Sequence, residues 1–268
     1  MISTDNAHSL SCTASINSLL AVIIILTFLS GCSPKPTKLP IKLMWGDQVL
    51  NCHQALPELP LWQLDNIQFY LSDFNNNGQA IALVEKGHDT QQKNLALLGS
   101  DCQSDGRWQL HFEQALQPGE FSFNLGVPFE LNHQALLTSA SPLNQSDMFW
   151  TWQLGYKFFR LDLATEQQQN DKLQTGWQFH LGSTGCQSAS VMRAPAEECA
   201  YPNRPRFTLH YQGEASLVLD LAPLLSEVLQ NQEITQDSCM SDPNTLIYKE
   251  LLPKIGVNGT AQIWRWQS

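Results

Sequence analysis

The chain lacks the short motifs that identify most hydrolases and phosphate-binding enzymes. It contains no G-x-S-x-G, no H-E-x-x-H, no phosphate-binding loop and no paired carboxylates in a motif. Its cysteines show no C-x2-C spacing, which leaves a tetrahedral zinc site only as an alternative. We therefore expect a protein that is not an enzyme.

Positive charge is also scarce. The chain carries 15 Lys and Arg against 25 Asp and Glu, for a net charge of -10. Nucleic-acid binding depends on clustered Lys and Arg that neutralise phosphates, so this composition argues against a nucleic-acid partner. An acidic surface instead suits docking to a cationic patch on a partner protein.

One apolar run, Leu19–Leu29, is eleven residues long, too short to cross a membrane and typical of a secretion signal. It ends in LSGC, which resembles a bacterial lipobox with cleavage before Cys32 and lipid on its sulfur. We expect a lipoprotein signal peptide over residues 1–31 and a Pro-rich tether over residues 32–40. Ser33 rather than Asp follows the cysteine, which favours the outer membrane, facing the periplasm or the cell surface. The signal departs from the usual pattern by having no Lys or Arg at its start, and a buried helix with a chance cysteine is the alternative.

Export would place five cysteines in an oxidising compartment, where pairing is the default: Cys52, Cys102, Cys186, Cys199 and Cys239. Cys186 and Cys199 close a short loop and are the first expected pair. Cys52 with Cys102 is the second, tying the first strand to a later one. Cys239 is then left over.

Apolar and polar side chains alternate in many short segments of residues 41–268. Residues 159–163, for example, read Phe-Arg-Leu-Asp-Leu, and turn signals recur between such segments. Residues 68–74 and 80–84 flank an Asn-Gly pair and predict a hairpin. We expect an all-β chain whose residues 41–268 form a single antiparallel β-sandwich with a few short helices.

Helix signals are few. Pro223–Gln230 has a proline near its start and apolar residues at helical spacing, which predicts a short helix. Leu143–Trp152 is a second candidate, in which Asn144 or Ser146 would cap the first turn.

Soft-metal donors and large aromatics gather in residues 126–162: His133, Met148, Trp150 and Trp152. Imidazole and thioether suit copper better than magnesium or calcium. His180 follows in the segment FHLGSTGC, where it alternates with two apolar residues and would face away from the core. We expect His133 and His180 to converge as copper ligands, with Met148 as a third donor. The alternatives are a hydrogen-bonding corner histidine, an inert strand histidine and a core-filling methionine.

The motifs GVPFELNH, SPLN, MFWTWQLGYKFFRLD, HLGSTGC and CMS resemble the MbnP-like family, over most of the chain after Cys32. The resemblance implies a periplasmic or lipid-anchored protein that binds copper. It also implies a di-haem, cytochrome c peroxidase-like partner that oxidises a tryptophan, for which Trp150 and Trp152 are the candidates. Opening the indole to kynurenine would expose an aryl amine able to ligate copper. In the family a second cysteine usually follows CMS, and its absence here implies that Cys239 is a buried thiol.

A function of a different class also fits the composition. The eight tryptophans could form an aromatic platform for a carbohydrate or a protein, and an exposed aromatic stripe would support that reading. Core packing is the alternative for Trp150 and Trp152.

Overall fold

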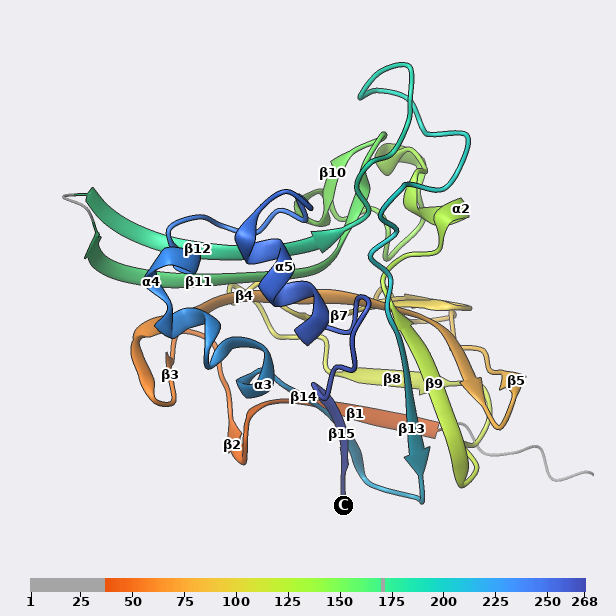
Figure 1. Cartoon of the computed structure of the whole chain (residues 1–268). Coiled ribbons are helices and arrows are strands. Elements are labelled where there is room, and N and C mark those ends of the chain that lie inside the picture. The colour runs from red at the N-terminus through yellow and green to blue at the C-terminus, as the bar shows by residue number, and fades with distance from the viewer. Residues whose placement is uncertain (1–36, 170–171) are drawn as a thin grey trace, which may run out of the picture. The chain divides into compact units, whose positions relative to one another are not determined.

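Strands in two sheets make up most of the regular structure (Figure 1). The computed structural model describes residues 37–169 and 172–268. The predicted signal peptide, residues 1–31, and the predicted lipidation site, Cys32, lie outside the described residues. The predicted class, all-β with a few short helices, is confirmed. No helix in the described part of the chain is long and apolar enough to cross a membrane.

The larger sheet has ten strands: β3 (Ala55–Leu56), β4 (Leu59–Asn76), β5 (Gln79–Ala80), β6 (Gln91–Gln92), β7 (Leu95–Ser100), β9 (Gly119–Leu125), β10 (Phe149–Thr151), β11 (Gly155–Gln169), β12 (Lys172–Gly182) and β13 (Arg206–Tyr211). The long strand β4 is its centre, pairing with β11 and β9 along one edge and with β7 along the other. β12 extends the sheet beyond β11, and β13 extends it beyond β9. The predicted Asn-Gly hairpin joins β4 to β5, with Asn77 and Gly78 both at positive φ, as a two-residue turn requires.

The smaller sheet has five strands: β1 (Thr37–Trp45), β2 (Gln48–Val49), β8 (Gln109–Phe112), β14 (Ser216–Asp220) and β15 (Trp264–Gln267). The prediction of a wholly antiparallel sandwich needs one correction, because β1 and β14 pair in parallel. A parallel pair needs a long crossover connection, and the larger sheet supplies it. β1 also begins inside the segment predicted as a tether, since Leu39 and Ile41 alternate into the core.

The core lies between the two sheets and is rich in aromatic rings. The Trp264 ring from β15 meets Phe69 of β4 at 5.7 Å and Phe123 of β9 at 5.2 Å between centroids, both edge to face. Phe74 of β4 meets Phe112 of β8 at 5.4 Å in the same way. Edge-to-face contacts of this kind stabilise a sandwich beyond the burial of apolar area.

The helices are short: α2 (Phe129–Asn132), η1 (Leu136–Thr138), η2 (Ser146–Met148), α3 (Ala222–Leu225), η3 (Val228–Gln230), α4 (Gln232–Thr235) and α5 (Leu246–Lys254). The predicted helix at Pro223–Gln230 is present but divided into α3 and η3. The predicted helix at Leu143–Trp152 is wrong beyond η2, because β10 instead hydrogen-bonds to the start of β11. Its first turn is preceded by Gln145 with no side-chain capping bond, so neither predicted cap is used.

Both expected disulfides are present. Cys52–Cys102 joins Cα atoms 5.4 Å apart, and Cys186–Cys199 joins Cα atoms 4.0 Å apart, just below the usual range of about 4.4–6.8 Å. Cys239 is a free, buried thiol. Burial raises its pKa to about 11, so it is protonated at neutral pH.

Candidate functional site

Three segments that are distant in sequence meet at one end of β11 and β12. They are the end of α2, the turn that precedes β11, and the loop that follows β12 and carries the Cys186–Cys199 disulfide. The GVPFELNH, WQLGY and HLGSTGC motifs supply these three segments. The stretches singled out in the sequence therefore converge in the fold.

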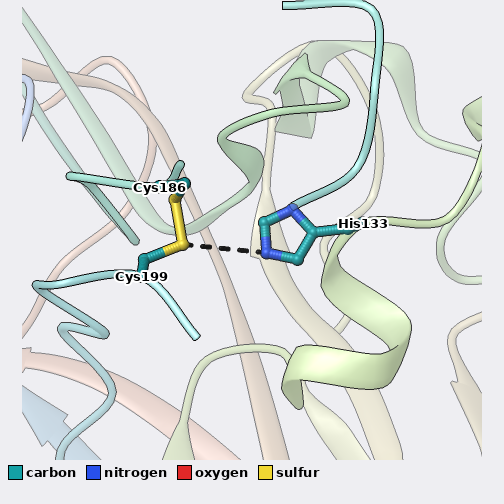
Figure 2. Close-up of side chains that lie close together, drawn as sticks. All are labelled: His133, Cys186 and Cys199. Carbon is teal, nitrogen blue, oxygen red and sulfur yellow. Dashed lines mark hydrogen bonds between the residues drawn. A yellow bond between two sulfur atoms is a disulfide. The ribbon is translucent and has the colours of Figure 1, made fainter. Parts of the chain in front are cut away.

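His133 points from the end of α2 toward the disulfide (Figure 2). Its Nδ1 lies 3.0 Å from the carbonyl oxygen of Trp152, which can only accept, so Nδ1 carries the hydrogen and Nε2 keeps its lone pair. Burial lowers the pKa of His133, and the bond to the Trp152 carbonyl offsets part of that effect. The imidazole is therefore neutral at pH 7, with its lone pair on Nε2.

The disulfide faces that nitrogen. Cys199 Sγ lies 3.9 Å from His133 Nε2, a contact rather than a hydrogen bond, because a disulfide sulfur carries no hydrogen. The ligand atoms of His133, Cys186 and Cys199 all lie within 4.8 Å of one another, and no other group of three His, Cys, Asp or Glu ligands does so in the part of the chain that the structure describes. In the disulfide form, however, neither sulfur is a thiolate, so the imidazole is the only strong donor of the three.

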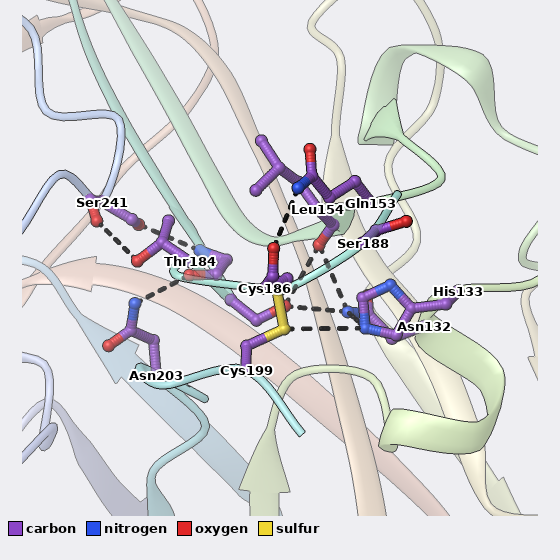
Figure 3. The surroundings of a disulfide bond; sticks show 12 residues. Asn132, His133, Gln153, Leu154, Thr184, Cys186, Ser188, Cys199, Asn203 and Ser241 are labelled. Atoms are coloured by element: carbon purple, nitrogen blue, oxygen red, sulfur yellow. Dashed lines mark hydrogen bonds between the residues drawn. A yellow bond between two sulfur atoms is a disulfide. The ribbon is translucent and has the colours of Figure 1, made fainter. Parts of the chain in front are cut away.

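Hydrogen bonds hold the segments around the disulfide (Figure 3). Gln153 Nε2 donates to the carbonyl of Cys186 at 2.9 Å. Thr184 and Tyr201, just outside the two cysteines, exchange backbone hydrogen bonds of 2.9 and 3.0 Å. These contacts position both cysteines by means other than the S–S bond.

Asn132 joins the three segments. It is buried, its Nδ2 donates to Ser183 Oγ at 2.9 Å, and its Oδ1 accepts from the backbone N–H of Tyr156 at 2.8 Å. The same Nδ2 lies 3.2 Å from His133 Nε2. Asn132 thus fixes the position of its neighbour His133 relative to β11 and β12.

Gly155 is required by this arrangement. Its φ is +80°, a backbone conformation that residues other than glycine rarely adopt. A Cβ at this position would come within 2.4 Å of the Asn132 side chain. The glycine of the WQLGY motif therefore allows the close approach of Asn132.

His180 lies on β12, paired in register with Arg160 of β11. Its Nε2 is 2.6 Å from Asp162 Oδ1, and Arg160 binds the other oxygen of that carboxylate at 2.7 Å. Burial raises the pKa of Asp162, but the hydrogen bonds and charges of His180 and Arg160 outweigh it, so the net shift is downward. The pKa of His180 is lowered, chiefly by burial. The lowered pKa values of both groups are consistent with an ionised Asp162 that accepts Nε2–H from a neutral His180. The lone pair of His180 is then on Nδ1.

The other predicted site residues surround these histidines. Met148 is fully buried in the hydrophobic core. Trp150 is half-buried and its ring covers Gly182, where a Cβ would come within 2.4 Å of Cζ3. Gly182 is two residues from His180 and so lies on the same face of β12. Trp152 is 37% exposed, and its backbone carbonyl oxygen lies 3.0 Å from His133 Nδ1.

The structure gives the two predicted histidine ligands separate partners. His133 contacts Asn132, the Trp152 carbonyl and Cys199, whereas the His180 ring contacts Asp162 of β11. Within residues 37–169 and 172–268, no hydrogen bond, ion pair or ring contact joins the two, and the three-ligand group contains His133 without His180. The convergence of both imidazoles on one copper ion therefore stays a prediction.

Three residues that matter here were missed by the sequence analysis: Asn132, Asp162 and Cys199 as a neighbour of His133. Asn132 stands in the GVPFELNH motif next to His133, which was the available signal. The partnership of Asp162 with His180 depends on the register of β11 and β12, for which the sequence offered no signal.

Comparison with known proteins agrees with this architecture. The sequence profile of the MbnP family matches residues 34–241. Among solved structures, the chain is similar to MbnP from Methylosinus trichosporium, with a TM-score of 0.70 over 86% of this chain and 97% of that chain, at 18% sequence identity. At that identity the likeness shows a shared fold. No curated protein matches the chain.

Fold and site together define a class of β-sandwich protein with a histidine–disulfide corner at one end of the larger sheet. The match of the family profile extends over most of the chain and includes this corner. The chain belongs to the MbnP family.

Proposed function

We propose that this chain is an exported, lipid-anchored copper-binding protein of the outer membrane, matured by a di-haem, cytochrome c peroxidase-like partner that oxidises a tryptophan. Membership of the MbnP family supports the proposal, since the family resemblance implies both copper and that partner. The acidic composition supports docking to a cationic partner surface.

The observation that carries the proposal is the state of the two histidines. In each, an oxygen acceptor fixes one ring nitrogen, and the lone pair is on the other: Nδ1 of His180, and Nε2 of His133, which also accepts from Asn132 Nδ2 at 3.2 Å and would exchange that bond for a metal. Metal-binding histidines are commonly oriented in this way by a carbonyl or a carboxylate. Met148 is the third candidate donor. This donor set fits a soft ion such as copper better than a hard cation.

Trp150 is the better candidate for oxidation to a ligand. Its ring lies over Gly182, on the face of β12 that also carries His180, so the modified residue would belong to the same face of the sheet as that imidazole. In the reaction two peroxide molecules would deliver two oxygen atoms across the C2–C3 bond of the indole and leave as two waters. Hydrolysis of the formyl group then releases formate and leaves kynurenine. Trp152, being exposed, is better placed to contact the partner.

Copper affinity measured after co-production with the partner tests this function. The oxidised protein is titrated against a chromophoric Cu(I) chelator, alone and as His180→Ala, His133→Ala and Trp150→Phe. We expect His180→Ala and Trp150→Phe to weaken copper binding at least tenfold, and His133→Ala to weaken it as well. His210→Ala, which removes an exposed strand histidine, is the matched control and should change nothing. Unchanged affinity in all three site variants would refute the proposal.

The lipid anchor has its own test. Replacement of Cys32 by Ser should release the protein from the membrane fraction into soluble extract. Unchanged membrane association would show that the anchor lies elsewhere.

The alternative of a carbohydrate- or protein-binding platform has less support. All eight tryptophans lie in the described residues, and Trp152 alone among them is exposed. A stacking platform needs several exposed rings on one surface, and the buried tryptophans belong to the core.

A further inference from the structure

Cys199 Sγ already lies at the distance from His133 Nε2 that two ligands of one metal ion have, whereas the two bonded sulfurs are closer together than that. Donor atoms about 2.0–2.3 Å from one ion lie roughly 3.5–4 Å from each other. Cys199 Sγ and His133 Nε2 are already 3.9 Å apart, and all three ligand atoms fall within 4.8 Å. After the S–S bond is broken, the two sulfurs would have to move apart by only about 1.5–2 Å to reach the spacing of two ligands on one ion.

The surroundings would keep the ligands together after reduction. His133 is oriented by the Trp152 carbonyl, and its Nε2, which also accepts from Asn132 Nδ2 at 3.2 Å, lies 3.9 Å from Cys199 Sγ. The Gln153 bond to Cys186 and the backbone pair of Thr184 with Tyr201 hold both cysteines without the disulfide.

The site can also be reached. The loop of residues 187–198 between the cysteines is largely exposed, including Val191 and Met192 at 55% and 63%. On the other side, a cavity of about 160 Å³ is lined by Cys199, Asn132 and Ser183, among others. The two cysteines themselves are buried, at 5% exposure each, so a reductant would reach the sulfurs only when the exposed loop between them moves aside.

We propose that the Cys186–Cys199 disulfide is a redox gate for an alternative copper site, in which two thiolates and the His133 imidazole bind one Cu(I) ion. His133 is also a candidate ligand of the site proposed above, so only one of the two sites uses it at a time. A dithiol reductase of the thioredoxin class would supply two electrons and two protons, converting the disulfide to two thiols and itself becoming a disulfide. Binding of Cu(I) then releases the two thiol protons and forms two Cu–S bonds and one Cu–N bond. Thiolate and imidazole donors select soft ions, and three donors suit Cu(I). Reoxidation of the thiols by a disulfide acceptor reverses these steps and expels the ion.

This inference goes beyond the function proposed above. It concerns the reduced protein, and it requires neither His180 nor a modified tryptophan. Copper bound by the oxidised protein tests the proposed function, whereas copper gained on reduction tests the gate, so either can fail alone.

The experiment is an anaerobic Cu(I) titration of protein produced without the peroxidase-like partner, before and after reduction, with the reductant removed and thiols counted. Reduced protein should bind one Cu(I) more than oxidised protein. The gain should disappear in the double variant Cys186→Ser/Cys199→Ser and persist in Cys52→Ser/Cys102→Ser, the matched control that removes the other disulfide. His133→Ala should weaken the added site at least tenfold.

Two outcomes would overturn the inference: no gain on reduction, or a gain that survives loss of Cys186 and Cys199. A gain for Zn(II) without one for Cu(I) would overturn the assignment to copper. If the double variant does not fold, reduced wild-type protein alkylated at Cys186 and Cys199, with the sites verified by peptide mass, takes its place and should show no gain.

Discussion

Replacing Asp162 by Asn tests the buried charge network that orients His180. The change keeps the shape of the side chain but removes its negative charge. Asp162 accepts from His180 Nε2 at 2.6 Å and from Arg160 Nε at 2.8 Å, with Arg160 also contributing an ion pair at 2.7 Å. The asparagine amide can satisfy only part of this set.

The size of the loss follows from burial. The Asp162 side chain is 10% exposed, and removing one member of a buried ion pair costs about 3–5 kcal/mol. Arg160 is 20% exposed and keeps a second carboxylate, Asp147, at 3.2 Å, which reduces the cost. We therefore expect a loss near the lower limit, about 3 kcal/mol.

Urea unfolding at pH 7, followed by tryptophan fluorescence, measures this loss as a lower midpoint at unchanged slope. Asp65→Asn is the matched control, because Asp65 lies 3.9 Å from His53 with both side chains more than half exposed. Exposed pairs of this kind contribute about 0–1 kcal/mol. Equal effects of the two substitutions would refute the claim that the Asp162–His180 pair is a structural part of the site.

Three further predictions concern the same region. Gly155→Ala should destabilise the fold by about 2–4 kcal/mol in the same urea assay, because the residue has a positive φ and the new Cβ would displace the buried hydrogen bonds of Asn132. Gly213→Ala is the control: its φ is also positive, but nothing lies within 4 Å of the new Cβ, so it should cost only about 1 kcal/mol. Because the folded pKa values of His133 and His180 are lowered, their contribution to stability is full above the unfolded pKa of about 6.5 and is lost as pH falls through the folded values. Urea midpoints should therefore fall between pH 7 and pH 5, less so in a variant lacking both histidines. Cys239 should resist iodoacetamide in the native protein at pH 8 and react in urea, as intact mass will show; labelling in the native state would contradict its burial.

The strands could be predicted because their signal is local. Alternation at a period of two, as in residues 159–163, and an Asn-Gly turn after β4 each depend on neighbouring residues only. The parallel pairing of β1 with β14 joins residues 37–45 to residues 216–220, and no local pattern records such a contact. The segment 143–152 misled the helix prediction because its partner, the start of β11, decided its conformation.

The site could be predicted only in part, for the same reason. The pairing of Cys186 with Cys199 followed from a short loop, which closes at low entropic cost. The neighbourhood of His133 depends on a loop folding back across 66 positions, and that of His180 on a strand register. Residue types indicated soft-metal chemistry, but only the fold shows that the two histidines have separate partners.

Metal analysis of protein purified from its native host, combined with intact mass and peptide mapping, tests the central claim most directly. The host supplies the partner on which the proposed tryptophan oxidation depends. We predict stoichiometric copper, together with a tryptophan at Trp150 that has gained one oxygen and lost one carbon. Protein that carries no copper, and whose tryptophans are all unmodified, would contradict the claim.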